Sequence, residues 1–366
     1  MLSYVGTEGS YLLYPGCWFP VNGAGFNRFS ATMRITAPAG QTVIASGEPS
    51  APASTADGDV YTFHYDRQSF PGTVLIGPYV SMPGSATGSA ITLYLDKDDA
   101  QYASSYSAAA ENVLAFYAGK FGVLPDNRLA LVEIPDGTLG GYSAPGVVAI
   151  AKRGFTAPVD YGLLANEISH QWWRCLVSPA TPNDAYLGEG LATYSSALFI
   201  QHDEGETAFE DRMHTIAIDA LIHESQSPIA EASQLQPFSP EYDSVVYDKG
   251  AMVFHMLRWV IGDNAFFAAL RELARQYAWR PVTTAEFQEL AEQASKQSLT
   301  YFFAQWVDST GVPQFHRQWA IYRTQSGYQV VGKIQQDLDI FRMPVDVRVY
   351  LRGGRPVNDR LMVIGT

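Results

Sequence analysis

The residues whose types and spacing could do chemistry begin with one short segment in the middle of the chain. Residues 164–173 read LANEISHQWW, so Asn166 and His170 are four positions apart. On a helix both side chains would lie on one face, close enough to contact the same ion. Glu167 lies between them, where a carboxylate could activate a water molecule held by that ion. Taken alone the segment is weak evidence, because E-x-x-H also occurs on the polar face of ordinary amphipathic helices.

Two further side chains that could take part in the same chemistry follow later in the sequence. Eighteen residues separate His170 from Glu189, which lies in the segment YLGEGLATY at 186–194 and opens the next predicted helix. A histidine and a glutamate on neighbouring helices could belong to a tetrahedral zinc site that keeps one position open for water. Tyr247, in the segment YDKGA, carries a phenol that could donate a hydrogen bond to a developing oxyanion. The order and spacing of these pieces are more specific than any one of them.

With these motifs, the sequence resembles the M1 family (gluzincin) metallopeptidases over nearly its whole length. The resemblance implies zinc as the cofactor and a peptide or protein as the substrate or ligand. It also implies His170 and Glu189 as the second and third zinc ligands. Glu167 then corresponds to the general base, and Tyr247 to the tyrosine that stabilises the transition state.

The first departure from the family pattern is Asn166, which stands where the first zinc-binding histidine is expected. An amide oxygen is less basic than imidazole, and zinc prefers nitrogen and sulfur donors. Loss of even a group that supports a ligand typically costs about 10–100-fold in metal affinity or activity, so loss of a ligand should cost more.

The second departure lies in the segment GGYSAPG at 140–146, which aligns with the family motif G-x-M-E-N and the Pro-Gly that follows it. The expected substrate-binding residues are Gly141, Tyr142, Ser143 and Ala144. In the family, the glutamate of this motif anchors the free α-amino group of the substrate. Ser143 stands at that position and has no charge to hold an ammonium group. Strict aminopeptidase specificity is therefore not expected, whether or not metal binds.

The elements needed to position these residues are predicted from periodicity. Short runs rich in Thr, Val, Ile and aromatic residues predict strands at 29–35, 41–46, 60–65, 72–76 and 91–95. Apolar residues that recur three and four positions apart predict helices at 98–121, 160–174, 188–200, 207–224, 246–261, 264–277 and 299–307. Thr283 and Glu286 predict a capping box at the start of a further helix that ends at 295. Further strands are expected at 129–134, 147–150, 315–322, 328–334 and 345–351, and residues 140–146 are expected to form a loop.

These elements predict an α+β multidomain fold. Residues 1–95 are expected to form a partial N-terminal antiparallel β-domain, and residues 313–366 the beginning of a C-terminal β-sandwich domain. Between them, the resemblance implies a thermolysin-like, mainly helical catalytic domain at 96–312. The chain is long enough to bury a sizeable core in such an arrangement.

Composition excludes some classes of function. The net charge is −13 and no cluster of Lys and Arg stands out, so nucleic-acid binding is not expected. No run approaches the roughly 18 apolar residues of a membrane span, and the N-terminus lacks the pattern of a signal peptide. The chain is therefore expected to be soluble as given, and its compartment is left open, as is its oligomeric state.

Three other features receive structural interpretations. Trp172 and Trp173 are expected to pack in the core, and Asp248 and Lys249 to form a structural pair beside Tyr247. Cys17 and Cys175 could form one long-range disulfide or remain two free thiols.

Two functions are consistent with these residues. The first is a degenerate M1 homologue in which zinc binding is weakened or lost, leaving a groove that binds a peptide or protein. The alternative is an active metallopeptidase with an altered metal site and a specificity that is not strictly aminopeptidase. An asparagine introduced on purpose at 166 would not account for Ser143.

Overall fold

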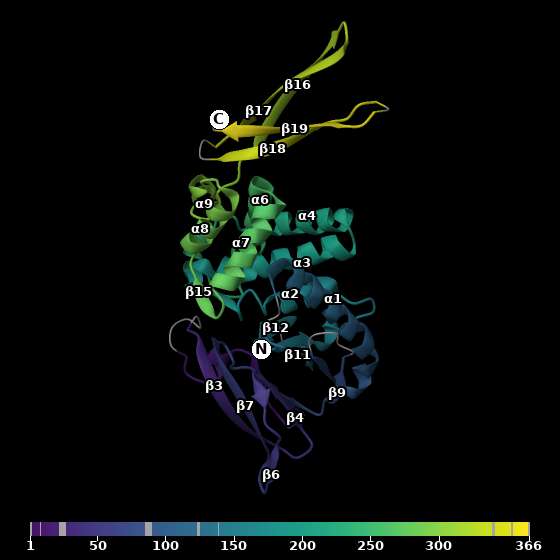
Figure 1. Cartoon of the computed structure of the whole chain (residues 1–366), viewed down its shortest axis with the longest axis vertical. Helices are drawn as coiled ribbons and strands as arrows, with labels where there is room; N and C mark the ends of the chain where they lie inside the picture. Colours follow the sequence, from purple (N-terminus) through teal and green to yellow (C-terminus); the bar gives the residue numbers. More distant parts are fainter. Residues whose placement is uncertain are drawn as a thin grey trace.

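The computed structural model describes residues 2–7, 9–21, 27–84, 90–122, 125–137, 139–338, 341–352 and 354–364. Antiparallel β-sheets lie at one end, a mainly helical body lies in the middle, and two β-hairpins lie at the other end (Figure 1). This arrangement confirms the predicted α+β fold class. None of the helices in the described part is long and apolar enough to cross a membrane.

The N-terminal region consists of two antiparallel sheets that share a small apolar core. One sheet has the order β1 (Ser3–Val5), β2 (Ser10–Leu12), β8 (Val74–Gly77) and β4 (Thr42–Ala45). The other pairs β3 (Phe29–Ala37) with β7 (Gly58–Ser69), and β7 also pairs with β5 (Glu48–Pro49) and β6 (Ala53–Thr55). The alternating burial along β3 is typical of a sheet with one face in solvent.

A five-stranded mixed sheet supports the site. Its order is β12 (Gly141–Ala144), β13 (Val147–Ala151), β11 (Arg128–Ile134), β10 (Ala90–Leu95) and β9 (Val80–Pro83). Strand β10 falls within the first expected region, yet it pairs in parallel with β11. The expectation of a loop at 140–146 was wrong, because β12 pairs antiparallel with β13. Every residue of β13 is buried, as expected for a strand covered on both faces.

Helices fill the middle of the molecule. They are α1 (Ala103–Phe121), α2 (Tyr161–Ser169), α3 (Glu189–Asp203), α4 (Glu206–Ile222), α5 (Pro240–Tyr242), α6 (Gly250–Ile261), α7 (Asp263–Gln276), α8 (Thr284–Ser295) and α9 (Thr300–Trp306). Both hydrogen bonds of the predicted capping box are present at Thr283 and Glu286. The prediction of one helix over 160–174 was wrong at its end, because α2 stops at Ser169.

Shorter elements connect these helices and strands. They are the 3-10 helices η1 (Pro15–Cys17), η2 (Lys97–Tyr102), η3 (Lys152–Gly154), η4 (Pro182–Leu187) and η5 (Ile229–Gln234), the π-helix η6 (Asp243–Lys249), and the paired strands β14 (Val177–Pro179) and β15 (Arg280–Val282). The π-helix runs directly into α6, and π-helical turns are frequent at functional sites.

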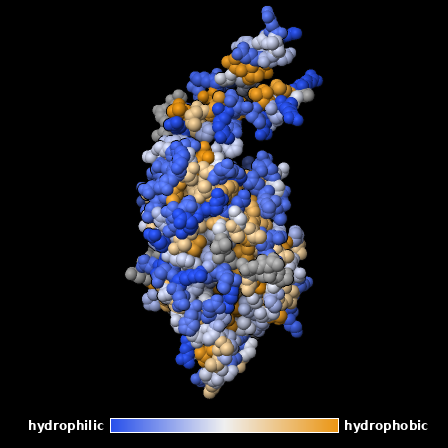
Figure 2. Space-filling model, viewed as in Figure 1, coloured by the Kyte–Doolittle hydropathy of each residue, from blue (hydrophilic) through white to orange (hydrophobic). Residues whose placement is uncertain are grey.

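Two antiparallel hairpins end the described chain: β16 (Phe315–Thr324) with β17 (Gly327–Gln336), and β18 (Arg342–Val349) with β19 (Val357–Ile364). The sequence had not indicated β19. The Gln305 side chain joins α9 to the second hairpin by two hydrogen bonds of 2.9 Å with the main chain of Arg342. Hydrophobic residues are visible on the surface of these hairpins (Figure 2).

Candidate active site

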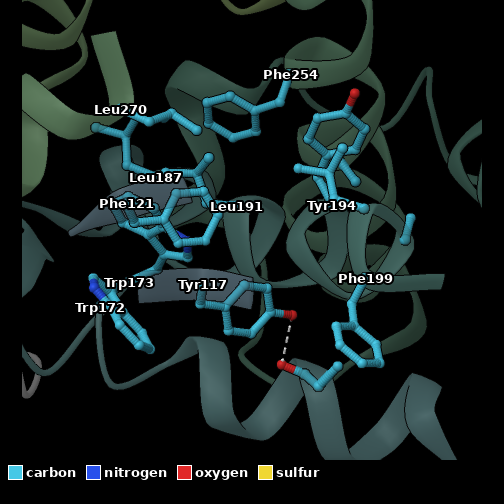
Figure 3. Packing of buried hydrophobic residues seen from close by; sticks show 14 of the residues in the cluster. Tyr117, Phe121, Trp172, Trp173, Leu187, Leu191, Tyr194, Phe199, Phe254 and Leu270 are labelled. Carbon is cyan, nitrogen blue, oxygen red and sulfur yellow. Dashed lines mark hydrogen bonds between the residues drawn. The ribbon is translucent and has the colours of Figure 1, made fainter. Parts of the chain in front are cut away.

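Helix α2, which carries Asn166 and Glu167 and is followed directly by His170, is fixed by its packed face. The Asp160 side chain caps its first turn by accepting a hydrogen bond from the Leu163 amide at 3.1 Å. Leu164 and Ile168 are fully buried, and the Tyr117 hydroxyl donates a hydrogen bond of 3.0 Å to the carbonyl of Ala165 (Figure 3). The opposite face of the helix is thereby held toward the pocket.

The chain leaves helical geometry directly after α2. Arg174 has φ +140°, a backbone conformation that side-chain-bearing residues rarely adopt. Trp172 and Trp173 are fully buried within a network of aromatic rings, which confirms their predicted packing role. The Trp173 indole donates a hydrogen bond of 3.0 Å to the Ser195 hydroxyl of α3, so this turn ties the two site helices together.

The imidazole of His170 is oriented toward Glu189. Its Nδ1 lies 3.0 Å from the carbonyl oxygen of Trp173, which can only accept a hydrogen bond, so Nδ1 carries the proton. The other nitrogen, Nε2, lies 3.5 Å from Oε2 of Glu189, the first residue of α3. An imidazole nitrogen beside a carboxylate oxygen is an arrangement that suits a shared cation.

The carboxylate of Glu167 is buried and bound by Ser143. The Ser143 hydroxyl lies 2.7 Å from Oε2 of Glu167 and 2.8 Å from its main-chain oxygen. Burial raises the pKa of Glu167, and nearby His170 and the Ser143 hydrogen bond oppose that rise. Gly141 lies against the same carboxyl, because a Cβ built on Gly141 would be 2.5 Å from the Glu167 carboxyl carbon. The β12 backbone thus packs directly on Glu167.

Tyr247 lies in the π-helix η6 and lines the same pocket as β12. Burial, and then the charge of Glu189, raise the pKa of the Tyr247 phenol well above its usual value. The phenol is therefore protonated at neutral pH, and it remains able to donate a hydrogen bond to an oxyanion.

These residues surround one pocket of about 630 Å³. Of the expected site residues, those that line it are Gly141, Tyr142, Ser143, Asn166, Glu167, His170, Glu189 and Tyr247. The expected residue outside the lining is Ala144, which is buried and accepts a hydrogen bond of 3.1 Å from the Gln171 side chain. The pocket is completed by residues of the N-terminal β-region, including Tyr14 and Phe29.

Sequence reasoning missed several residues of this pocket: Arg174, Arg212, Tyr242, Asp243 and Asp248. Arg174 comes four positions after His170, but a turn and not a helix brings it to the pocket, so helical spacing gave no signal for it.

Two other predictions from the sequence concern the partner of Lys249 and the state of the two cysteines. Lys249 pairs with Glu224 at 3.1 Å, so the expected Asp248–Lys249 pair was wrong. Cys17 and Cys175 are both free thiols, and burial raises the pKa of Cys175 to about 12, which keeps that thiol protonated.

Comparison with known proteins shows the family. The Peptidase family M1 domain matches residues 112–306, more than half of the chain, and the chain belongs to this family. Aminopeptidase M1-C of Oryza sativa subsp. japonica is 23% identical over 308 residues, which cover 78% of this chain and 35% of that protein. Human endoplasmic reticulum aminopeptidase 2 is 23% identical over 64% of this chain and 27% of its own length. The chain thus spans about a third of the length of these relatives.

Solved structures show the same fold. A two-domain M1 zinc metallopeptidase, a point mutant bound to L-tryptophan, matches with a TM-score of 0.69 and 19% identity, over 85% of this chain and 72% of the other. A mutant M1 zinc metallopeptidase from Deinococcus radiodurans matches with a TM-score of 0.64, also at 19% identity, over 84% of this chain and 72% of the other.

Family membership implies zinc as the cofactor. The donor set of this chain does not fit a site with three strong protein ligands. No group of three or more His, Cys, Asp and Glu residues that could hold a metal ion is found within the described ranges. His170 and Glu189 form a pair, and Asn166 lines the same pocket with an amide in place of a third such donor.

Proposed function

We propose that this M1-family protein is a degenerate peptidase homologue that binds zinc weakly or not at all, and whose pocket retains a peptide- or protein-binding role. We propose the same division of the chain as before: an N-terminal β-domain at 1–95, a catalytic-type domain at 96–312, and the beginning of a β-sandwich at 313–366. His170 and Glu189 are the proposed remaining metal ligands, Glu167 the former general base, and Tyr247 the former oxyanion-binding tyrosine.

The observation that carries this proposal is the incomplete donor set. His170 and Glu189 lie 3.5 Å apart, and Asn166, at the position expected to hold the remaining ligand, lines the same pocket. Each lost ligand weakens zinc binding, and an amide oxygen replaces an imidazole nitrogen poorly. With two good ligands, occupancy at the low free zinc concentrations of ordinary buffers would be well below one equivalent.

The environment of Glu167 supports the same proposal. The carboxylate that would take a proton from water is already engaged by the Ser143 hydroxyl at 2.7 Å. Ser143 also replaces the charged group that would hold a substrate ammonium. A pocket without a strong metal site and without that anchor retains shape and hydrogen-bonding groups, which suit binding of a peptide better than its cleavage.

A second candidate is an active metallopeptidase with altered specificity. What favours it is that Glu167, His170, Glu189 and Tyr247 all line one pocket. The two ligands and the Asn166 amide could together hold a metal at raised concentration. Loss of the ammonium anchor would then favour internal peptide bonds or blocked N-termini as substrates.

The deciding experiment restores the ligand. Zinc is measured by elemental analysis in the purified native protein, in Asn166→His, and in a control, Asn264→His, which adds a histidine at an exposed helix position. Each protein is then incubated with a broad peptide library, with and without added zinc. We expect well under one equivalent of zinc and no cleavage for the native protein and the control, and near-stoichiometric zinc for Asn166→His.

Three outcomes discriminate further. Stoichiometric zinc in unsupplemented native protein would overturn the proposal. Library cleavage by native protein that is lost both on chelation and in Glu167→Gln would establish the active enzyme instead. If Asn166→His gains zinc without activity, the Tyr142–Ala144 segment is the second site of lost function.

A further inference from the structure

Arg174 combines an unfavourable backbone conformation with a position in the pocket. Its φ of +140° lies where glycine is at ease and an arginine is not. The conformation is enforced locally: the Arg174 amide donates to the carbonyl of Val177 at 2.7 Å, and the Cys175 amide donates to that of His170 at 3.0 Å. Side chains that persist in such conformations tend to mark functional sites. The arginine side chain therefore calls for its own explanation.

Hydrogen bonds from side chains of the N-terminal β-region also fix this turn. The carbonyl of Cys175 accepts hydrogen bonds from the Ser69 hydroxyl at 2.7 Å and from the Arg28 guanidinium at 2.6 Å. Arg28 also donates to the carbonyl of Leu176 at 3.1 Å. Bonds between segments more than a hundred residues apart hold the residue after Arg174 in place. The guanidinium is thus presented to the pocket from a rigid support.

The guanidinium has one polar partner and spare donors. It donates to the Tyr142 hydroxyl at 2.7 Å and lies 4.7 Å from the centre of the Tyr142 ring. Among the residues that the structure describes, it forms no ion pair. A guanidinium carries five N–H donors, and its planar fork matches the two oxygens of a carboxylate. Most of that capacity remains available to a group that enters the pocket.

The nearby carboxylates already have partners of their own. Glu189 lies beside His170 at 3.5 Å, and Glu167 is bound by Ser143 at 2.7 Å. Neither carboxylate approaches Arg174 as an ion pair, although all of these side chains line the same pocket. Arg174 thus places a positive charge in the same pocket as the two expected metal ligands, and Arg212 also lines that pocket.

We propose that Arg174 anchors the ligand of this pocket by binding a carboxylate of a peptide, either its C-terminal carboxylate or an Asp or Glu side chain. The inference rests on the proposed function, because it assigns a ligand class to the same peptide-binding pocket. Tyr142 orients the guanidinium, and the pocket gains a cation that does not depend on a metal.

The test uses three pools of hexapeptides that carry an uncharged BODIPY label and otherwise neutral random sequences. The first has a free C-terminal carboxylate and no acidic side chain, the second is C-terminally amidated with one Asp or Glu, and the third is amidated with none. Binding is measured by fluorescence anisotropy on native protein, Arg174→Gln, Arg174→Lys and the control Arg275→Gln, which removes an exposed guanidinium on α7.

We expect at least one carboxylate-bearing pool to bind native protein about tenfold or more tightly than the third pool, as for a charge-assisted hydrogen-bonded pair. Arg174→Gln should abolish that preference, Arg174→Lys should keep part of it, and Arg275→Gln should keep all of it. The pool that binds identifies the source of the carboxylate. Thermal melting of each variant verifies that it is folded.

Two results overturn the inference in different ways. If the three pools bind the native protein equally, or if Arg174→Gln keeps the preference, Arg174 is not the anchor and the peptide-binding pocket stands. If no pool binds the folded native protein, the peptide-binding proposal itself fails, and the role of Arg174 fails with it.

Discussion

The aromatic core and the pocket wall, meaning the residues that line the pocket, both include residues in or next to α2 and α3, yet they differ in what they require. In the core, Trp172 and Trp173 of the turn after α2 and Tyr194 of α3 are fully buried and in contact with further rings (Figure 3). In the pocket wall, Asn166 of α2 and Ser143 of β12 are polar. A substitution that removes buried volume from the core costs stability, whereas a substitution in the pocket wall can change the polar groups there without disturbing the packing.

Under the proposed function, this difference would let a peptidase scaffold persist without a strong metal site. The Ile168 side chain and the two tryptophans are fully buried and fix where α2 lies, and the Trp173 carbonyl orients the ring of His170. An exchange of histidine and asparagine at position 166 is therefore expected to alter the pocket and leave the fold in place. The comparison between core and wall can be tested by substitutions on each side of α2.

The largest expected effect is in the core. Trp173→Ala removes a fully buried indole and leaves the Ser195 hydroxyl without its donor, so unfolding free energy should fall by about 3–5 kcal/mol. Urea unfolding followed by circular dichroism measures it. The matched control is Trp319→Ala on β16, where the indole is 61% exposed and the change should be small. Equal losses in the two variants would contradict the distinction between core and surface.

The next effect is in the wall. Asn166→His should create a zinc site whose occupancy stabilises the fold by about 2.7 kcal/mol when free zinc is a hundredfold above the dissociation constant. The thermal midpoint is measured with zinc and with EDTA. Adding Arg174→Gly should tighten zinc binding further, because a guanidinium that lines the same pocket repels the ion. If zinc raised the thermal midpoint of the native protein as much as that of Asn166→His, the result would count against a weakened metal site in the native protein.

A smaller effect depends on pH. Burial, and then the charge of Asp219, raise the pKa of Asp248 to about 7, while Arg212 opposes the rise. The folded state therefore holds this proton more firmly than the unfolded chain, where the pKa is about 3.9. Its contribution to stability is fully present below about pH 4 and is lost as pH rises through 7.

Asp248→Asn should remove that dependence. At pH 8 the variant should be more stable than the native protein by about 1–2 kcal/mol, since the side chain is partly solvated. At pH 4 the two proteins should unfold at nearly the same urea concentration, which serves as the internal control. A constant difference across the pH range would mean that the substitution acts through packing and not through ionisation.

The fold was more accessible to sequence reasoning than the pocket, for a physical reason. The long helices and the capping box at Thr283 are set by local periodicity and local hydrogen bonds. Strand β12 was missed because its glycine-rich sequence has little strand propensity, and pairing with β13 decides its conformation. Glu167, His170 and Glu189, which the sequence singles out by order and spacing, line one pocket, and their roles as base and ligands stay a prediction.

The early end of α2 and the position of Arg174 were not accessible in this way. No glycine or proline occurs between 163 and 178 to indicate a break. The turn depends on Ser69 and Arg28, which lie more than a hundred residues earlier in the chain. Bonds of that kind have no local signature, so a pocket residue held by them emerges only from the three-dimensional structure.

The smallest expected effect compares two substitutions at one backbone position. Arg174→Ala removes the side chain and keeps the strain of φ +140°, whereas Arg174→Gly removes both. Strain of this kind costs about 1–3 kcal/mol, and the greater flexibility of glycine in the unfolded chain offsets about 1 kcal/mol of the gain. The free energy of unfolding of Arg174→Gly should therefore exceed that of Arg174→Ala by about 1 kcal/mol, as measured by urea titration. Equal stability would mean that the turn relaxes once the guanidinium is gone, so that the ligand-binding side chain and not the enclosing hydrogen bonds sets the backbone of the wall.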